Sequence, residues 1–288
     1  MMRIPHPPCK SSSQLISALK LYALLFLSQS HFVNAYIFIY AGCSQEKYQP
    51  NSPFQANLNS FFSAAVNSAS QSSFNSFALG NTTPEAATEA AVYGLYQCRG
   101  DLEHSDCGSC IQSSVSQIVL VCPYSGGASL QLDGCYLRYE HADFLGKLDT
   151  SVVQKKCSKS VSDDVEFFRR RDDVLADLQR AIGFRVSSSG LVQGFAQCVG
   201  DLSSGDCSSC LSEAVSQLKN LCGSAAAAQV FLGKCYAQYW AAGYYDLNSP
   251  TDSGNEDDVG KTVAIIVGIV GGLAVFIVIL SVCRKAMG

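Results

Sequence analysis

The sequence has little histidine and no excess of basic charge. Its 288 residues contain 20 lysines and arginines against 24 aspartates and glutamates, a formal net charge of −4. Because nucleic-acid binding ordinarily needs a basic patch, this balance argues against a nucleic-acid partner. Histidine occurs four times, and no G-x-S-x-G hydrolase motif is present. A Ser/His/Asp catalytic site therefore has no support in the sequence.

Few side chains remain that could form any other active site. After the first 35 residues the chain keeps two histidines, His104 and His141, in different parts of one half. Glu140 and Asp143 are the carboxylates near the last strand of that half, whereas a glycosidase needs two carboxyls that face each other. We therefore predict that the protein is not an enzyme and uses neither cofactor nor metal.

The N-terminus resembles a secretory signal peptide. An apolar stretch at residues 15–28 follows sparse positive charge, and small residues precede a cleavage point after Ala35. A first membrane helix is the alternative, but Lys20 interrupts the stretch and its apolar core is short. We expect residues 1–35 to be removed during export.

The C-terminus predicts a transmembrane helix at residues 262–283. This stretch carries no charge, and at ~1.5 Å per residue it spans roughly 33 Å, enough for a bilayer core of ~30 Å. Arg284 and Lys285 follow it, which places the tail 284–288 in the cytoplasm and disfavours a GPI signal. An acidic linker, residues 246–261, precedes the span. The predicted topology is single-pass type I.

Three features around these segments predict modification or assembly. Gly268 and Gly272 form a G-x-x-x-G pattern, which favours close helix association, although a span can also merely tolerate glycine. Cys283, at the cytoplasmic edge, is a candidate for S-acylation or an inert thiol. Asn81 begins the sequon Asn-Thr-Thr and is a candidate glycosylation site.

The rest of the chain is dominated by a repeated cysteine pattern. Residues 98–110 read CRGDLEHSDCGSC and residues 198–210 read CVGDLSSGDCSSC, at an offset of 198 − 98 = 100 positions. Of the 14 cysteines, Cys9 and Cys283 fall in the signal and membrane segments. The other twelve form two sets of six: Cys43, Cys98, Cys107, Cys110, Cys122 and Cys135, then Cys157, Cys198, Cys207, Cys210, Cys222 and Cys235. A two-copy repeat of this length predicts tandem small domains.

Four functions compete for this cysteine pattern. A zinc site or a redox Cys-x-x-Cys would suit the cytosol, but the export signal and the even cysteine number favour disulfides. Adhesion through Arg99-Gly100-Asp101 is disfavoured because Val199 replaces the arginine in the second copy, so we interpret Arg99 as incidental. Six cysteines allow 15 pairings, and spacing alone does not choose among them.

Hydrophobic periodicity predicts an α+β fold in both copies. In the first copy we expect a strand at 37–42, a helix from Pro53, a strand at 91–98, a helix capped by Asp106 and a hairpin at 129–140. The second copy repeats this order, with its first helix at 164–182, where the mixed charges of residues 169–173 predict a solvated face. The predicted domains are residues 36–145 and 150–245.

The spacing C-x8-C-x2-C, followed by cysteines 12 and 13 residues further on, resembles the ginkbilobin-homologous domain, also called the salt-stress response/antifungal domain. This resemblance implies two helices on a five-stranded antiparallel sheet in each domain. It also implies six disulfides: Cys43–Cys122, Cys98–Cys107, Cys110–Cys135, Cys157–Cys222, Cys198–Cys207 and Cys210–Cys235.

Two such domains with one span and a short tail resemble the plasmodesmata-located proteins. Cysteine-rich receptor-like kinases have a similar ectodomain but carry a large cytosolic kinase, which the predicted tail does not contain. The resemblance implies a place in the plasma membrane at plasmodesmata, with the ectodomain in the apoplast. It further implies control of cell-to-cell traffic and callose deposition. The implied partners are other plasmodesmal membrane proteins, the callose-synthesis machinery and viral movement proteins.

A lectin-like wall anchor is the alternative function. Ginkbilobin-type domains bind mannose through an asparagine after the first cysteine, but Ser44 and Ser158 occupy that position here, so this site is not carried over. Stacking of another wall glycan on Tyr236, Tyr239 or Trp240 is the remaining route, and we favour a core or interdomain role for these rings. An antifungal or redox-active secreted protein has the weakest support.

Overall fold

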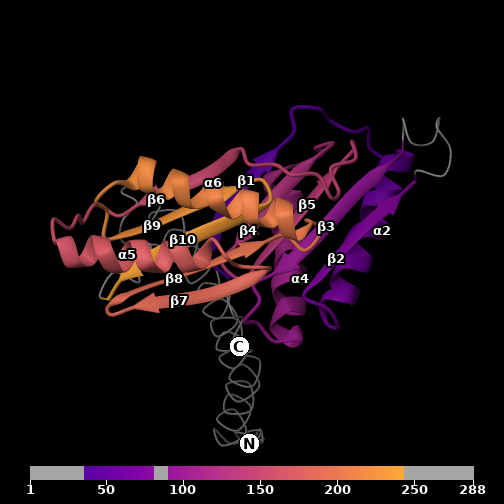
Figure 1. The fold of residues 1–288 in the computed structure, drawn as a ribbon. Helices are drawn as coiled ribbons and strands as arrows, with labels where there is room; N and C mark the ends of the chain where they lie inside the picture. The colour runs from indigo at the N-terminus through magenta and orange to yellow at the C-terminus, as the bar shows by residue number, and fades with distance from the viewer. Residues whose placement is uncertain (1–35, 81–89, 243–288) are drawn as a thin grey trace, which may run out of the picture. The chain divides into compact units, whose positions relative to one another are not determined.

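The computed structural model describes residues 36–80 and 90–242 (Figure 1). The predicted signal peptide, Asn81, the acidic linker, the predicted span with Gly268, Gly272 and Cys283, and the tail all lie outside these ranges. Inside them, no helix combines the length and apolar character needed to cross a membrane.

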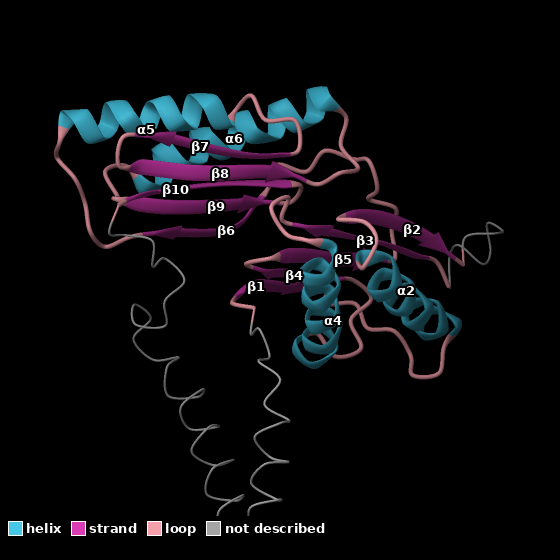
Figure 2. Cartoon of the chain, turned by 90° about the horizontal axis from the view of Figure 1, so that it is seen from below, coloured by secondary structure: helices cyan, strands magenta, loops and turns pink. Residues whose placement is uncertain are grey.

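The first domain is a five-stranded antiparallel sheet with two helices on one face (Figures 1 and 2). The strands follow the order β1-β4-β5-β3-β2, and helix α2 packs beside α4. The elements are β1 Phe38–Cys43, α2 Pro53–Ala69, β2 Phe74–Leu79, β3 Val92–Cys98, α4 His104–Val121, β4 Ala128–Leu132 and β5 Cys135–Glu140.

The second domain repeats this architecture, with the strand order β6-β9-β10-β8-β7. Its helices cover one face of its sheet (Figure 2). The elements are β6 Val152–Cys157, α5 Val165–Leu178, β7 Phe184–Ser189, β8 Val192–Cys198, α6 Ser204–Cys222, β9 Ala227–Leu232 and β10 Cys235–Ala241. The prediction of two tandem domains, each with two helices on a five-stranded antiparallel sheet, is confirmed.

Three disulfides in each domain join its second helix to the sheet. The first bond joins the first strand to the C-terminal end of this helix. The second joins the third strand to the first turn of the helix. The third joins the middle of the helix to the last strand. The bonds are Cys43–Cys122, Cys98–Cys107 and Cys110–Cys135 in the first domain, and Cys157–Cys222, Cys198–Cys207 and Cys210–Cys235 in the second. These are the pairs that the family resemblance implies. Because domains of this size bury a modest core, each bond is worth ~2–5 kcal/mol.

The apolar face of α2 shows how each helix is fixed to its sheet. Phe54, Leu58 and Phe61 recur at helical spacing and are all buried. A side chain at Gly94 on β3 would collide with the Phe61 ring. Glycine therefore lets α2 approach the strand closely enough to bury that ring.

The outermost strands, β2 and β7, are not among the strands that hydrophobic periodicity predicts. Strand β2 pairs along its whole length with β3, from Phe74 opposite Gln97 to Leu79 opposite Val92. It is an edge strand whose residues are partly or fully exposed. Its sequence FNSFAL therefore lacks the alternation of a half-buried strand.

The predicted cap of the second helix is wrong by three residues. Helix α4 has Glu103 at its N-cap, and Asp106 lies within the first turn. In the second domain Ser203 occupies the cap, accepts a hydrogen bond from the Asp206 backbone N–H at 3.1 Å and donates to its carboxylate at 2.7 Å. The aspartate is favoured there because negative charge near a helix N-terminus is stabilising.

The predicted solvated face at residues 169–173 is correct for Arg169 and wrong for Arg171. Arg169 is exposed and pairs with Glu166 at 2.8 Å. Arg171 is only 8% exposed, and its guanidinium donates to the Gly223 carbonyl at 2.6 Å and lies over the Phe168 ring. An arginine stem packs well against apolar groups, so a run of mixed charge need not be wholly solvated.

The two helix caps provide a matched stability test. We expect Ser203→Ala to lower the free energy of unfolding by about 1 kcal/mol, because two N-terminal contacts are lost. Glu103→Ala should cost less than half of that, since Glu103 makes no side-chain cap bond. Thermal unfolding of the full chain in detergent measures both, with a shift of roughly 2–4 °C expected for Ser203→Ala. Equal losses would contradict this view of the caps.

Candidate functional site at the seam between the two domains

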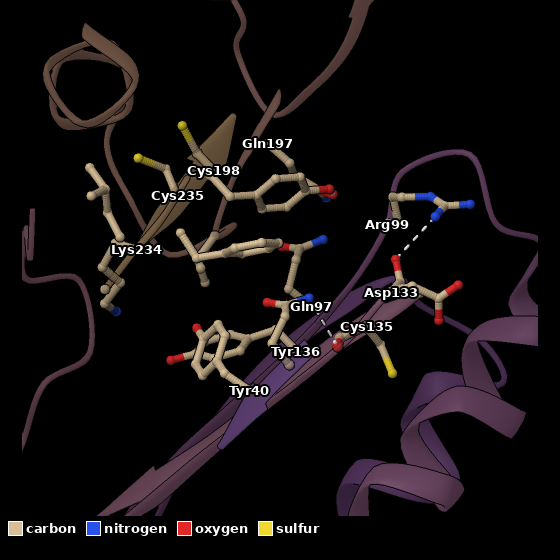
Figure 3. Close-up of a pocket in the computed structure, with 17 residues that line it drawn as sticks. Tyr40, Gln97, Arg99, Asp133, Cys135, Tyr136, Gln197, Cys198, Lys234 and Cys235 are labelled. Carbon is tan, nitrogen blue, oxygen red and sulfur yellow. Dashed lines mark hydrogen bonds between the residues drawn. The ribbon is translucent and has the colours of Figure 1, made fainter. Parts of the chain in front are cut away.

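By their contacts, the described residues from Ile37 to Ala242 form one compact unit that contains both sheets. We call the region where the sheets meet the seam. It joins buried residues of both domains in a single cluster: Tyr40, Leu95, Tyr136, Val199 and Phe231. Figure 3 shows the polar and aromatic side chains around this cluster.

Two glutamines at the same position of the two copies cross the seam. Gln197 donates from its side-chain amide to the Cys98 carbonyl at 3.0 Å. Gln97 accepts from the Gly200 backbone N–H at 2.9 Å through its amide oxygen. Each glutamine therefore satisfies a backbone group of the opposite domain, in or next to the disulfide loop of that domain. Hydrogen bonds of this kind contribute about 1 kcal/mol each.

The glycines of the repeated Gly-Asp also lie at the seam. A Cβ added to Gly200 would come within 2.7 Å of the Phe74 ring, and a Cβ on Gly100 would collide with Phe184. Phe74 begins β2 and Phe184 begins β7. Each domain thus places the first aromatic ring of its edge strand over the glycine of the other, and no other residue leaves room for it.

The phenols of the seam are packing groups. Tyr40 contacts Phe231 edge-on with ring centroids 5.7 Å apart, and Phe231 stacks on Tyr236 at 5.1 Å. Burial raises the pKa of Tyr136 to about 12 and also raises that of Tyr40 and Tyr236. These hydroxyls therefore stay neutral at physiological pH.

The linker between the domains is built into the seam. Phe144 lies beside two cations, the Arg138 guanidinium at 4.5 Å and the Lys234 ammonium at 4.8 Å from the ring centroid. Arg138 also pairs with Asp149 at 3.5 Å. The negative charge density on the face of the Phe144 ring attracts both cations.

Asp201, the aspartate of the second Gly-Asp, contacts both Lys234 and the linker. Lys234, only 1% exposed, forms an ion pair with Asp201, and the same carboxylate accepts from the Gly146 backbone N–H at 2.8 Å. Burial lowers the pKa of Lys234, and Asp201 opposes that effect. Asp201 therefore joins the scaffold of its own domain to the linker.

Arg99 has a role that the sequence does not reveal. It pairs with Asp101 at 2.7 Å, donates to the Asp133 carbonyl at 3.0 Å and lies over the Phe195 ring of the second domain at 5.5 Å. The interpretation of Arg99 as incidental is therefore wrong. Its counterpart Val199 is buried in the same seam. Both residues serve contact between the domains.

The remaining space at the seam is too small for an organic ligand. The cavity among Tyr40, Gln97, Gln197 and Lys234 encloses about 20 Å³, which is room for one water molecule. In the described part of the chain no group of histidine, cysteine, aspartate and glutamate side chains could hold a metal ion. The geometry of the seam supports a structural role.

The candidate catalytic residues are not brought together. His104 begins α4 near the Cys98–Cys107 bond, and His141 follows the far end of β5, roughly 20 Å along the strand at ~3.3 Å per residue. Glu140 pairs with Arg138 at 3.2 Å, whereas Asp143 pairs with Lys147 at 3.7 Å. The two carboxylates thus serve different ion pairs.

The aromatic residues considered for glycan stacking are mostly enclosed. Tyr239 is 1% exposed and donates to the Ala225 carbonyl at 2.9 Å. Tyr236 lies in the seam and donates to Gln197 at 3.2 Å. Trp240 packs edge-on against Phe195. Tyr236 and Tyr239 thus have the core and interdomain roles that the sequence favours, and neither presents a free ring face.

Sequence reasoning misses the glutamines, Lys234 and the linker as seam residues. One signal was available. The sequence Gln-Cys-x-Gly-Asp-Leu occurs in both copies, at residues 97–102 and 197–202, and disulfide formation explains only its cysteine. No comparable signal marks Lys234, because glycine occupies the equivalent position 134.

Comparisons with known proteins agree with this architecture. The Salt stress response/antifungal family profile matches residues 42–142 and 154–242. Plasmodesmata-located protein 8 of Arabidopsis thaliana is 60% identical over 255 residues, which cover 88% of this chain and 91% of that protein. Plasmodesmata-located protein 6 of the same plant is 41% identical over 257 residues, 86% of this chain and 88% of that protein.

A solved structure resembles the described part of the chain. The crystal structure of the tandem DUF26 ectodomain from the Arabidopsis thaliana cysteine-rich receptor-like protein PDLP8 matches with a TM-score of 0.69 and 60% sequence identity. The match covers 72% of this chain and 100% of that one.

Two glycine substitutions test the seam. We expect Gly200→Ala to destabilise the protein by about 1–3 kcal/mol, because the added methyl group overlaps Phe74. Gly205→Ala is the control, since the nearest atom to its Cβ is 3.9 Å away and alanine favours the helix. Thermal unfolding of the full chain measures both, and adding Phe74→Ala to Gly200→Ala should recover part of the loss. A harmless Gly200→Ala would show that the domains do not meet as described.

Proposed function

Because the chain belongs to the plasmodesmata-located proteins, a family built on paired salt stress response/antifungal domains, we propose that it is a non-enzymatic receptor-like protein of plasmodesmata. The single observation that carries this proposal is the 60% identity to Plasmodesmata-located protein 8 across 91% of that protein. The sequence similarity covers both domains and the linker between them, so it applies to the tandem ectodomain and not to one domain alone.

The proposed topology is that of a type I membrane protein. The apolar N-terminal stretch would direct export, the span at 262–283 would anchor the chain, and Arg284 and Lys285 would keep the tail in the cytoplasm. The six disulfides support an oxidising location for the domains. The two domains would then face the apoplast as one body.

A binding role fits the described side chains better than a catalytic one. The seam encloses room for about one water molecule, and the neighbouring ion pairs are made between side chains of the chain itself. The seam holds the two domains in a defined relation, which presents their outer surfaces together. Such a body is suited to contact another molecule and to transmit that contact to a membrane assembly.

We propose that this assembly controls cell-to-cell traffic and influences callose deposition. The callose-synthesis machinery and other plasmodesmal membrane proteins would be its partners, and viral movement proteins would use the protein as a docking site. Support for these roles comes from family membership.

Imaging tests the location. The full chain carrying a fluorescent protein after residue 288 should form puncta at cell junctions that coincide with callose staining. A version whose span 262–283 is replaced by an unrelated membrane helix controls for simple membrane anchoring. An even plasma-membrane signal from the natural chain, without puncta, would overturn the proposal.

The G-x-x-x-G pattern makes a separate prediction about assembly. Gly268→Leu together with Gly272→Leu should weaken self-association, because larger side chains keep two helices apart. Crosslinking of the full chain in membranes should show at least a several-fold loss of dimer. Ile265→Leu, outside the glycine pattern, is the control. Unchanged crosslinking of the double variant would exclude this pattern as the contact.

A further inference from the structure

The internal repeat provides a natural control for one surface hollow in the first domain. The loop from β1 to α2 is held by the same backbone hydrogen bonds in both copies. Ser44 N–H donates to Gly127 at 2.8 Å, and Ser158 N–H donates to Ala227 at 2.9 Å. Tyr48 N–H donates to Tyr124 at 2.9 Å, as does Ser162 N–H to Ser224 at 2.8 Å. The backbone frame is therefore independent of these side chains.

The side chains on this frame differ sharply between the copies. The first domain carries Glu46, Lys47 and Tyr48, where the second has serine, valine and serine at 160–162. At the position equivalent to Tyr124 the second domain has Ser224, and at the position equivalent to His141 it has Ala241. Because the second domain keeps the same backbone hydrogen bonds without any of these groups, the shared frame does not require them.

In the first domain Glu46, Lys47, Tyr48 and His141 line an open hollow of about 220 Å³. Tyr48 forms its aromatic wall, supported by Phe54 with centroids 5.3 Å apart and by Tyr124 at 5.9 Å. The polar lining includes Glu46, Gln49 and His141. The hollow thus combines a ring face with several hydrogen-bonding groups, a combination typical of ligand sites.

The backbone around the hollow is strained. Among the described residues two non-glycine residues have a left-handed backbone, Asn51 with φ 63° and Tyr124 with φ 56°. Asn51 lies in the loop that lines the hollow, and Tyr124 holds the ring of Tyr48. Such conformations cost roughly 1–3 kcal/mol each and gather at functional sites.

The lining favours a neutral ligand rich in hydroxyl groups. Lys47 lies beside Glu46 and donates to the Pro123 carbonyl at 3.2 Å, so the site has no surplus of either charge. His141 Nδ1 lies 3.2 Å from the Ala91 carbonyl, and a hydrogen bond there requires the proton on Nδ1. In the neutral imidazole Nε2 is then an acceptor, and the Glu46 carboxylate is a second acceptor.

We propose that this hollow binds one sugar residue of a neutral cell-wall glycan, with its apolar face on Tyr48 and its hydroxyls on Glu46, Gln49 and His141. Sugar rings present an apolar face and a rim of hydroxyl donors, which matches an aromatic wall beside an excess of acceptors. The inference rests on the proposed apoplastic role and names the ligand class that the ectodomain would contact.

Binding of the full chain in detergent micelles to an oligosaccharide array tests the proposal. The probes are cellohexaose, mannohexaose, laminarihexaose and a xyloglucan oligosaccharide, with an acidic oligogalacturonide for comparison. The natural protein should bind at least one neutral probe. Tyr48→Ser and His141→Ala, which install the residues of the second domain, should each weaken that binding at least ten-fold. Ser162→Ala, the matched control in the second domain, should bind like the natural chain.

The outcomes separate clearly. Failure of all neutral probes, binding of the acidic probe alone, or equal binding by Tyr48→Ser would each overturn the site. Thermal unfolding verifies that the variants are folded, and the repeat indicates that they will be. Tyr48→Ser carrying the fluorescent protein should still reach plasmodesmata. Loss of puncta from the natural chain would refute the proposed location without touching the binding result.

Discussion

The disulfide loop between the third strand and second helix of each domain is the constraint on which the architecture depends. The bonds Cys98–Cys107 and Cys198–Cys207 each close a short loop, with a sequence separation of 9. A loop so short has few conformations, so it holds its glycine and aspartate in fixed positions. Gly100 and Gly200 can then receive the phenylalanine of the opposite domain. The same bonds that stabilise each domain therefore also shape the surface through which the domains meet.

The seam combines two kinds of contact with different consequences. The exchange of Phe74 and Phe184 follows the repeat and buries apolar surface, which favours association without much orientation. The ion pair of Lys234 and Asp201 occurs on one side only, and desolvating two charges offsets much of their attraction. Its net contribution to stability is small, but either charge left alone would be costly. Because both residues belong to the second domain and the Asp201 carboxylate also accepts from the Gly146 backbone N–H, the pair holds the linker against the second domain.

Much of the fold could be predicted from the sequence, because periodicity and cysteine spacing are local signals. The helix from Pro53 and the strand ending at Cys98 follow from such signals. The edge strand Phe74–Leu79 does not, since an exposed strand needs no alternation. Arg171 illustrates a second limit. Its burial depends on Phe168 and Gly223, and a contact 52 residues away along the chain leaves no mark in a charge pattern.

The candidate sites show the same division between local and long-range signals. The repeated Gln-Cys-x-Gly-Asp-Leu could be recognised as scaffold, but its partner across the seam could not, because that contact joins residues about a hundred positions apart. The hollow beside Tyr48 needs the structure as well, since Glu46 and His141 are distant in sequence.

The equivalent backbone hydrogen bonds of the two domains show which positions correspond. Residues that recur at these positions are ones the fold uses in both domains, and residues that differ are ones the fold tolerates. The six disulfide cysteines of each domain, the glycines at 100 and 200, and the glutamines at 97 and 197 recur because the architecture uses them in both copies. Tyr48, Tyr124 and His141 do not recur, so the shared frame does not require them. The proposed sugar site gives these side chains a role on the first domain, while the second domain keeps the frame without it.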